Sequence, residues 1–275
     1  MTVEGAYGQL LAEGYLRSEP KRGFFVQPFE AQSAPAAIPA RPSAAASVKE
    51  KSIQYDFTTN AVDTARFPFS TWARLMREVL TQEDSGLLAA SHPQGVEELR
   101  QAIVRYLGDF RGIQAEPEQI VVGAGSEYLT GLLTQLLGRE GGYAVEDPGY
   151  RKPARILANN GAQVLPIPLD AQGLRVDLLK RSRARVAHVT PSHHFPLGMV
   201  MPVTRRRALL SWAGQSEDRY IIEDDYDSEF RFSGRPIPAL QSLDTGERVV
   251  YLNTFAKSLA PSLRISYMVL PPHLL

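Results

Sequence analysis

The stretch Ile120–Leu137, IVVGAGSEYLTGLLTQLL, contains the pattern that decides the fold. It opens with β-branched residues typical of a buried strand and continues from Tyr128 with apolar residues at helical spacing. Between them lies the turn Gly123-Ala124-Gly125, followed by Ser126 and Glu127. A strand that enters a helix through a glycine turn is a unit of an α/β sheet, and the free N–H groups at the helix start favour an anion such as phosphate. An equally simple interpretation is a tight turn with Ser126 as the helix cap.

Six further short apolar runs predict strands in the rest of the chain, with helical spacing between several of them. Because strands alternate with helices, we expect an α/β fold with a mostly parallel seven-stranded sheet covered on both faces. The expected strands are Ile120–Val122, Tyr143–Val145, Val164–Ile167, Val186–Val189, Tyr220–Ile222, Val249–Leu252 and Tyr267–Leu270, and the expected helices include Val96–Leu107, Tyr128–Leu137 and Arg205–Trp212.

In an open α/β sheet, ligands bind beyond the carboxyl ends of the strands, so the residues after each strand are the candidates for function. Tyr150 offers an aromatic face, Asp224 a carboxylate that needs a positive partner, and Tyr226 a phenol. Lys257 offers a primary amine, with Arg264 seven residues later. Together with the anion site after the first strand, these groups match the needs of pyridoxal 5′-phosphate (PLP).

Two other ligands were considered for the same loops. A dinucleotide site would need a third glycine where Tyr128 stands, although Glu146, 23 residues beyond Gly123, is placed like a ribose-binding acid. A metal site at His193 and His194 is disfavoured, since neighbouring side chains on one loop seldom chelate a single ion and no thiol accompanies them. The nicotinamide interpretation therefore stays open as the weakest alternative.

Composition excludes several classes of protein. The chain has no cysteine, which excludes disulfide scaffolds and thiolate metal sites, and its 30 basic residues balance its 30 acidic ones. It has no long apolar run or secretory signal, so we expect a cytoplasmic protein that does not contact a membrane. From Pro28 to Val48, 15 of 21 positions are Ala, Pro or Ser, which predicts an extended linker over residues 28–52 between residues 1–27 and a folded domain over 53–275.

Two sets of motifs remain, one in each folded part of the chain. The first set is His92-Pro93-Gln94-Gly95 with Leu99-Arg100, Gly123–Tyr128, Asp147–Tyr150, Pro191–Gly198, Asp224-x-Tyr226 and Thr254-x-x-Lys257 with Arg264, and the second is Thr2-Val3-x-x-Ala6-Tyr7, Glu13–Leu16 and Gly23–Val26. With the first set, residues 53–275 resemble the large domain of the fold-type I, aspartate-aminotransferase-like PLP proteins. With the second, residues 2–27 resemble the recognition helix and wing of a GntR-type winged helix. A GntR-type reader, a linker and an aminotransferase-like domain together resemble the MocR/GabR group of transcriptional regulators.

The resemblance implies a role for each site residue. Lys257 would form a Schiff base with PLP, Asp224 would keep the pyridine nitrogen protonated, and Tyr226 would hydrogen-bond the ring's phenolic oxygen. Tyr150 would stack on the ring. The phosphate would be held by Ser126 with the Gly125–Glu127 backbone, Thr254 and Arg264.

The sequence departs from the resembled family at several points. Phe195 stands where an asparagine usually contacts the ring oxygen, so that contact is missing or replaced by His193 or His194, and Ala256 replaces a frequent serine. Met1 corresponds to the entry into the recognition helix and Leu275 follows the seventh strand directly. We therefore expect a chain truncated at both ends, without the small C-terminal domain and with weak or no specific DNA binding.

The predicted function is a PLP-binding GntR/MocR-type transcriptional regulator, in which the aminotransferase-like domain senses PLP or an amino-acid or amine effector. Its partners would be promoter DNA in a full-length protein and a second copy in a homodimer. The main alternative is a PLP-dependent aminotransferase that turns over an amino acid. Both need the amine of Lys257 and differ in turnover and DNA affinity.

Overall fold

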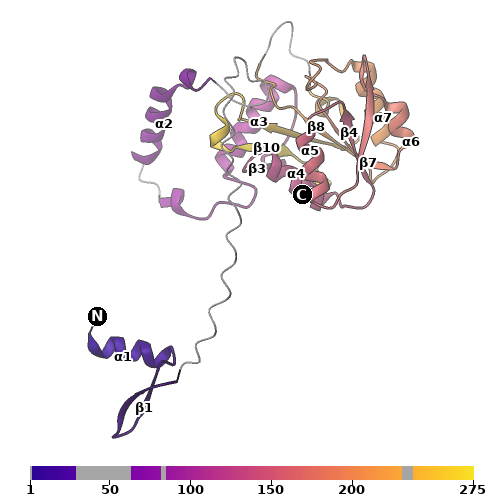
Figure 1. Cartoon of the computed structure of the whole chain (residues 1–275). Helices are drawn as coiled ribbons and strands as arrows, with labels where there is room; N and C mark the ends of the chain where they lie inside the picture. The colour runs from indigo at the N-terminus through magenta and orange to yellow at the C-terminus, as the bar shows by residue number, and fades with distance from the viewer. Residues whose placement is uncertain (1, 29–62, 82–84, 231–237) are drawn as a thin grey trace, which may run out of the picture. The chain divides into compact units, whose positions relative to one another are not determined.

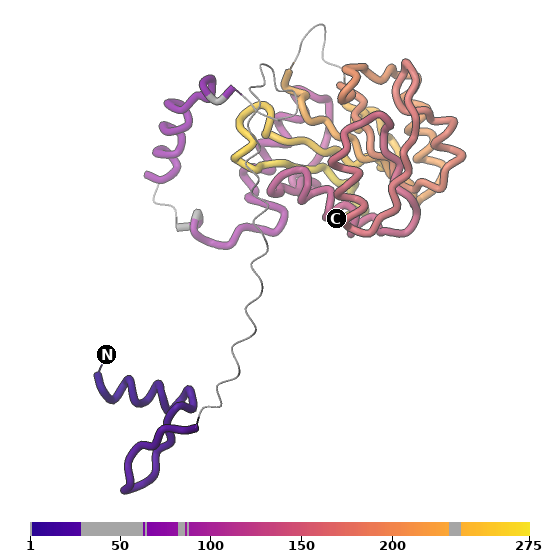
Figure 2. Tube along the Cα trace, viewed as in Figure 1, coloured from indigo at the N-terminus to yellow at the C-terminus, as the bar shows by residue number. Residues whose placement is uncertain are grey.

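The computed structural model describes residues 2–28, 63–81, 85–230 and 238–275 (Figures 1 and 2). The chain divides into two compact units, Met1–Phe57 and Thr58–Leu275. The predicted linker over 28–52 lies outside the described residues from position 29 onward. None of the helices in the described ranges has the length and apolar composition needed to cross a membrane.

The first unit contains one helix and one hairpin. Helix α1 (Val3–Ala12) begins after Thr2, whose Oγ1 accepts a hydrogen bond from the Gly5 N–H at 3.4 Å. Strands β1 (Leu16–Glu19) and β2 (Gly23–Val26) pair antiparallel, with Leu16 opposite Val26. Tyr7 on the helix meets Phe24 on the hairpin edge-to-face, with ring centroids 5.0 Å apart. No residue of α1 is buried, so this unit has no core of its own among the described residues.

The second unit is built on an eight-stranded sheet in the order β3-β10-β9-β8-β7-β4-β5-β6. Neighbouring strands from β9 to β5 run parallel, whereas β10 is antiparallel to both β9 and β3, and β6 is antiparallel to β5. The strands are β3 (Ile120–Gly123), β4 (Gly142–Asp147), β5 (Val164–Asp170), β6 (Gly173–Leu174), β7 (Ala184–Val189), β8 (Tyr220–Asp224), β9 (Val249–Thr254) and β10 (Ser266–Val269).

This sheet confirms the predicted α/β fold, including all seven expected strands. The expected number is one too low, because the two-residue edge strand β6 is too short to give a periodic pattern. The helices are α2 (Phe69–Thr81), α3 (Glu97–Arg111), α4 (Ser126–Leu136), α5 (Arg151–Asn159), α6 (Val176–Arg181) and α7 (Val203–Ala213). Short 3₁₀ turns occur at Thr64–Arg66, Ser85–Leu88, Pro117–Gln119, Gln241–Leu243, Pro261–Leu263 and Pro272–Leu274.

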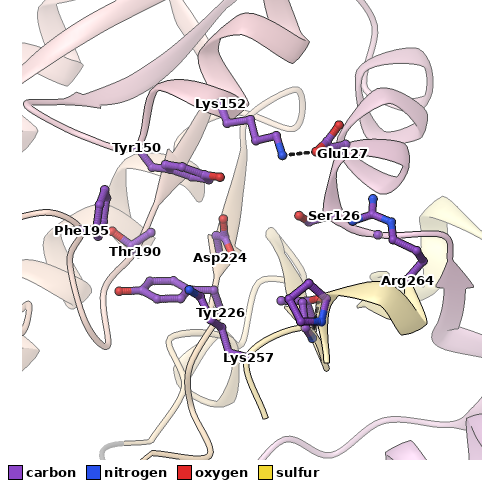
Figure 3. A pocket seen from close by; sticks show the side chains of 14 residues that line it. Ser126, Glu127, Tyr150, Lys152, Thr190, Phe195, Asp224, Tyr226, Lys257 and Arg264 are labelled. Carbon is purple, nitrogen blue, oxygen red and sulfur yellow. Dashed lines mark hydrogen bonds and ion pairs between the residues drawn. The ribbon is translucent and has the colours of Figure 1, made fainter. Parts of the chain in front are cut away.

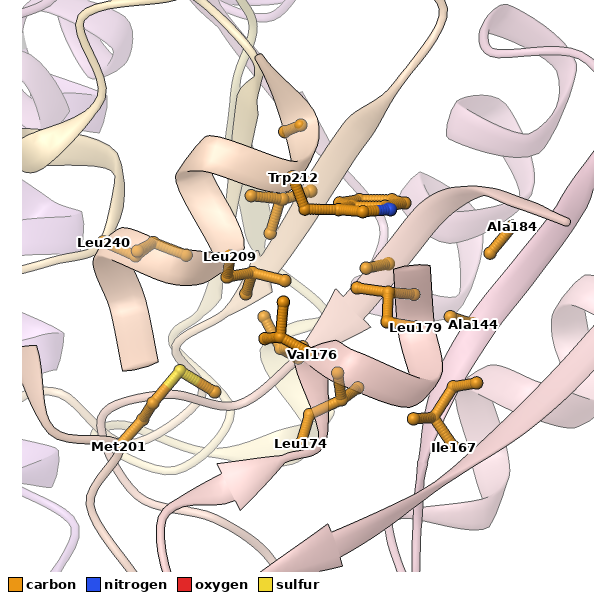
Figure 4. Close-up of a cluster of buried hydrophobic side chains, with 14 of the residues drawn as sticks. Ala144, Ile167, Leu174, Val176, Leu179, Ala184, Met201, Leu209, Trp212 and Leu240 are labelled. Atoms are coloured by element: carbon orange, nitrogen blue, oxygen red, sulfur yellow. The ribbon is translucent and has the colours of Figure 1, made fainter. Parts of the chain in front are cut away.

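Helices cover both faces of the sheet because strand residues alternate between them (Figure 1). On β9, Val250 and Leu252 pack in one cluster with α4 and α5, while Val249 and Tyr251 contribute to the two clusters on the opposite face. That opposite face is covered by α3, α6 and α7. Trp212 of α7 is fully buried at the centre of one of these clusters (Figure 4). The sheet is therefore the middle layer of three.

Strand direction determines which loops meet. The carboxyl ends of β4, β7, β8 and β9 lie at one edge because these strands are parallel. Strand β3 runs in the same direction as β9, because each pairs antiparallel with β10 between them. The amino end of β10 consequently lies at this same edge. We call it the carboxyl edge of the sheet.

Candidate functional site

A cavity of about 300 Å³ opens at the carboxyl edge (Figure 3). It is lined by all nine residues that the sequence predicts for the site: Gly125, Ser126, Glu127, Tyr150, Asp224, Tyr226, Thr254, Lys257 and Arg264. The roles of these residues stay predictions, but the structure brings their side chains or backbone to one place. Five further lining residues were not among the predicted site residues, and they are Lys152, Thr190, Phe195, Ala256 and Pro261.

One end of the cavity is formed by the amino terminus of α4. Gly125 is the N-cap with a φ of +103°, a conformation that an L side chain rarely adopts, and no side chain caps the helix. The simple interpretation of Ser126 as the cap is therefore wrong, because Ser126 is already the first helical residue and lies on the cavity wall. The first N–H groups of a helix have no intrahelical partner, so this end suits an anion.

Arg264 completes this anion-binding end. Its Nη2 donates a hydrogen bond to the carbonyl oxygen of Ala124 at 3.1 Å, which holds the guanidinium beside the glycine turn. A Cβ atom on Gly125 would collide with that guanidinium. Thr254 adds a hydroxyl, which accepts from the Ala256 N–H at 3.2 Å. A cation, a hydroxyl and a helix amino terminus with no Cβ in the way form a donor set that fits phosphate.

The floor of the cavity includes Asp224, at the end of β8. Its side chain is buried, and within the described residues no group donates a hydrogen bond to its carboxylate. Burial, reinforced by the negative charges of Asp225, Glu146 and Asp227, raises the pKa of Asp224 to about 7. The Nε2 of His188 lies 3.6 Å away, but burial lowers the pKa of His188 to about 4, so this ring stays neutral. A carboxylate in such a place fits a ligand that brings a protonated ring nitrogen.

Tyr226 lines the same cavity as Asp224, and its hydroxyl lies close to a histidine–aspartate pair. His193 Nδ1 lies 2.5 Å from Asp227 Oδ2, and the Tyr226 hydroxyl is 3.4 Å from the same nitrogen. Burial raises the pKa of Tyr226, with Asp227 adding to the effect, so the phenol keeps its proton and can donate it to an oxygen in the cavity.

Two aromatic rings form a further wall. Tyr150, placed directly before α5, meets Phe195 edge-to-face with ring centroids 5.8 Å apart. Phe195 thus lines the cavity where the resemblance leads one to expect an asparagine. Neither His193 nor His194 lines the cavity. The Nε2 of His194 is buried 3.6 Å from Glu146 Oε2, and His193 contacts the hydroxyl of the lining residue Tyr226. The sequence offered no signal for choosing between the two histidines.

Lys257 lies in the turn that follows β9 and is half-buried. Its side chain enters the same cavity as Asp224 rather than a separate one (Figure 3). An amine and a carboxylate that line one cavity of this size are the pair that a pyridine aldehyde requires.

The structure gives less support to the alternative ligands. Glu146 is buried and accepts hydrogen bonds from the Thr190 N–H at 3.0 Å and the Thr190 hydroxyl at 2.7 Å, so one of its carboxylate oxygens is occupied within the protein. Thr190 itself lines the cavity, and the sequence could have predicted this because Thr190 directly follows the strand β7. Within the described ranges, no group of three or more His, Asp or Glu residues is placed to hold a metal ion.

Comparison with known proteins places these observations in a family. The model of the family "Aminotransferase class I and II" matches residues 52–275. Among curated proteins, the uncharacterized HTH-type transcriptional regulator YdeL of Bacillus subtilis is 42% identical over 274 residues, covering 100% of this chain and 59% of that protein. The probable rhizopine catabolism regulatory protein MocR of Rhizobium meliloti is 38% identical, covering 99% of this chain and 58% of that protein. The chain thus spans less than two thirds of the length of these relatives.

Solved structures show the same fold in the second unit. A kynurenine aminotransferase from Pyrococcus horikoshii has a TM-score of 0.69 at 29% identity. The match covers 76% of this chain and 54% of the aminotransferase chain. A multiple substrate aminotransferase from Thermococcus profundus has a TM-score of 0.69 at 32% identity, with the same coverage. The regulators YdeL and MocR therefore match nearly the whole chain, whereas these two aminotransferases match about three quarters of it.

Proposed function

Because the chain belongs to the aminotransferase class I and II family, we propose that it is the PLP-binding part of a GntR/MocR-type transcriptional regulator that senses PLP or an amino-acid effector. The similarity of regulators over the full length of the chain supports this function. The observation that carries it is the cavity at the carboxyl edge, where the amine of Lys257 and the buried carboxylate of Asp224 line the same space.

PLP is the cofactor of this aminotransferase-like fold, and when bound it supplies an aldehyde and an electron-withdrawing ring. Lys257 provides the amine for covalent attachment. Asp224 holds the proton on the ring nitrogen, since that cation compensates the cost of burying the carboxylate. Tyr226 donates its phenolic proton to the ring oxygen, a contact for which Phe195 has no polar group.

The remaining cavity residues orient the cofactor. The ring of Tyr150 packs on its face, and the amino terminus of α4 binds its phosphate together with Thr254 and Arg264. The aromatic pair of Tyr150 and Phe195 would offer the ring an apolar contact surface. Each of these is a binding or orienting role that a sensor needs as much as an enzyme does.

The test is spectroscopic. The purified chain mixed with PLP should turn yellow, and borohydride reduction should fix the cofactor on the peptide that contains Lys257, as read by mass spectrometry. A Lys257→Ala variant should stay colourless. The matched control is Lys180→Ala, which removes an exposed lysine at the end of α6. Equal colour in the Lys257 variant and the wild type would contradict the assignment.

The second candidate is a working aminotransferase, which the similarity to solved aminotransferases favours. It is the weaker candidate because those enzymes match only about three quarters of the chain. Half-transamination by a panel of amino acids, followed as loss of the yellow colour, would support turnover. An unchanged spectrum would support a sensor.

We further propose promoter DNA as the partner of a full-length protein that contains residues 1–27, with weak or no specific binding by this chain, an amino acid or amine as the effector of residues 53–275, and a homodimer in the cytoplasm as the working form. In this arrangement residues 28–52 link the two functions. A gel-shift assay of a full-length version with its own promoter, with and without PLP, tests the DNA partner, and analytical ultracentrifugation tests the dimer.

A further inference from the structure

An ion pair crosses the rim of the cavity next to its anion-binding end. Glu127 comes from the first turn of α4 and Lys152 from the first turn of α5, and the Nζ of Lys152 pairs with the Oε1 of Glu127 (Figure 3). Both residues line the cavity, and their side chains are 43% and 48% exposed, respectively. Neither side chain is needed for any role described above.

The place of Glu127 presents an electrostatic conflict. It directly follows Ser126, at the helix end where Gly125 and Arg264 prepare a site for an anion. A carboxylate there is favoured by the helix dipole while the site is empty. Once a phosphate dianion occupies the site, the same carboxylate repels it, since neighbouring like charges repel even at the effective dielectric of a protein surface.

The positive charge of Lys152 offsets the negative charge of Glu127, with which it is paired. We propose that Lys152 acts as the charge-compensating partner of Glu127, so that the Glu127 carboxylate does not weaken the binding of the cofactor's phosphate group. The inference rests on the proposed PLP site. It makes Lys152 a specificity-determining residue for the phosphate group, acting through Glu127 and not through the ring.

A purely structural ion pair would behave differently. Pairs exposed to this degree contribute little to folding stability, about 0–1 kcal/mol. The pair of Arg185 and Asp218 has similar exposure, 50% and 51%, at 2.9 Å, and neither residue lines the PLP cavity. It therefore provides a matched control for the loss of an exposed salt bridge.

The experiment measures the affinity of the full chain for two probes, PLP and pyridoxal, which lacks the phosphate. We expect Lys152→Met to weaken PLP binding about tenfold and to leave pyridoxal binding within about twofold. Glu127→Gln should tighten PLP binding about threefold, because it removes the repulsion and frees the amine. The double variant should return to within about threefold of the wild type, and Arg185→Ala should change neither probe.

The outcomes separate the inference from the proposed function. If the wild type binds neither probe at Lys257, the PLP site itself is wrong. If the wild type binds PLP but Lys152→Met weakens both probes equally, or if the double variant is as weak as Lys152→Met, the compensating role is wrong while the PLP site stands. The Glu127→Gln variant keeps Lys152 and so tests the inference even if Lys152→Met folds poorly.

Discussion

Among single residues, Asp224 has the most unusual environment in the cavity. Its carboxylate is buried among Glu146, Asp225 and Asp227, and within the part of the chain that the structure describes the one basic group within ion-pair distance is the neutral ring of His188. A buried carboxylate without a cation is costly in its charged form, so its pKa rises to about 7. The charged form of Asp224 therefore destabilises the cofactor-free protein, and a cation that binds beside the carboxylate offsets this cost.

This environment predicts a pH effect on stability. The pKa of Asp224 is raised from its ordinary 3.8 to about 7 in the folded state, so the folded protein binds more protons than the unfolded chain between these values and loses stability as the pH rises. Asp224→Asn removes this loss. The stability advantage of the variant should grow by roughly 2 kcal/mol from pH 5 to pH 7 in the cofactor-free protein.

Denaturant unfolding at the two pH values checks this expectation. Asp218→Asn is the control, because hydrogen bonding to Ser216 and the charge of Arg185 lower the pKa of Asp218, which is ionised in both states across this range. A parallel pH trend in the two variants would contradict the assignment to Asp224.

At the level of elements, the two ends of helix α4 allow a comparison. Gly125 precedes the helix with a φ of +103°, and Gly138 follows it with a φ of +83°. A Cβ on Gly125 would meet the Arg264 guanidinium, whereas a Cβ on Gly138 would meet nothing within 4 Å. Both glycines have a positive φ, but of the two only Gly125 lines the cavity.

A comparison of Gly125→Ala with Gly138→Ala should therefore separate the effect of backbone strain on stability from the effect of the glycine turn on PLP binding. Both variants place an alanine at a positive φ and should lose about 1–3 kcal/mol of stability. Only Gly125→Ala should also displace Arg264 and weaken PLP binding, by about tenfold or more, measured by titration of the yellow absorbance. Equal PLP affinity in the two variants would refute the role given to the glycine turn.

The hairpin of the first unit predicts a salt effect on the proposed DNA binding of a full-length protein. Glu19 binds both Arg17 and Arg22 at 2.7 Å, so two of the basic residues near the hairpin are already paired. Glu19→Gln should release both and make the dependence of DNA affinity on salt steeper by about one to two units on a log–log plot. Fluorescence anisotropy with a duplex probe measures this slope.

Glu4→Gln is the control for net charge. It removes the same single charge from the first turn of α1 without releasing an arginine from Glu19. If both variants steepen the slope equally, charge alone explains the change and the pairing of Glu19 does not matter.

At the level of the folded α/β unit, a buried ion pair joins segments that are distant in sequence. Arg111 ends α3 and lies 2.8 Å from Asp225, which follows β8. Arg111 also donates to the Ser192 hydroxyl at 2.9 Å, and Tyr251 of β9 donates to Asp225 at 2.6 Å. Because Asp225 follows Asp224 directly, this network fixes the end of β8, from which Asp224 faces the cavity.

Arg111→Met should therefore be severely destabilising. It leaves Asp225 buried without its cation, which costs about 3–5 kcal/mol. The double variant Arg111→Met with Asp225→Asn removes both charges and should recover much of that loss. Chemical denaturation of the three proteins measures the coupling, and a double variant as unstable as the sum of the single ones would show that the pair does not act as a unit.

Much of the fold could be predicted from local pattern. The seven longer strands and the helices between them have their own periodicity, and an α/β alternation follows from it. The edge strand β6 has two residues and could not be predicted in this way. The cavity could be predicted in outline for the same reason, since parallel strands bring the residues after them to one edge.

The sequence by itself determined which residues end the strands, and with them the amine at 257, the carboxylate at 224 and the turn at 123–125. Only the tertiary structure decided that β10 is antiparallel, which brings Arg264 to the carboxyl edge although it precedes its strand. It also decided that Lys152 meets Glu127 and that Asp224 is buried beside other carboxylates and the neutral ring of His188. Local periodicity depends on neighbours along the chain, whereas strand direction, ion pairs and the cost of a buried charge depend on segments that meet only after folding.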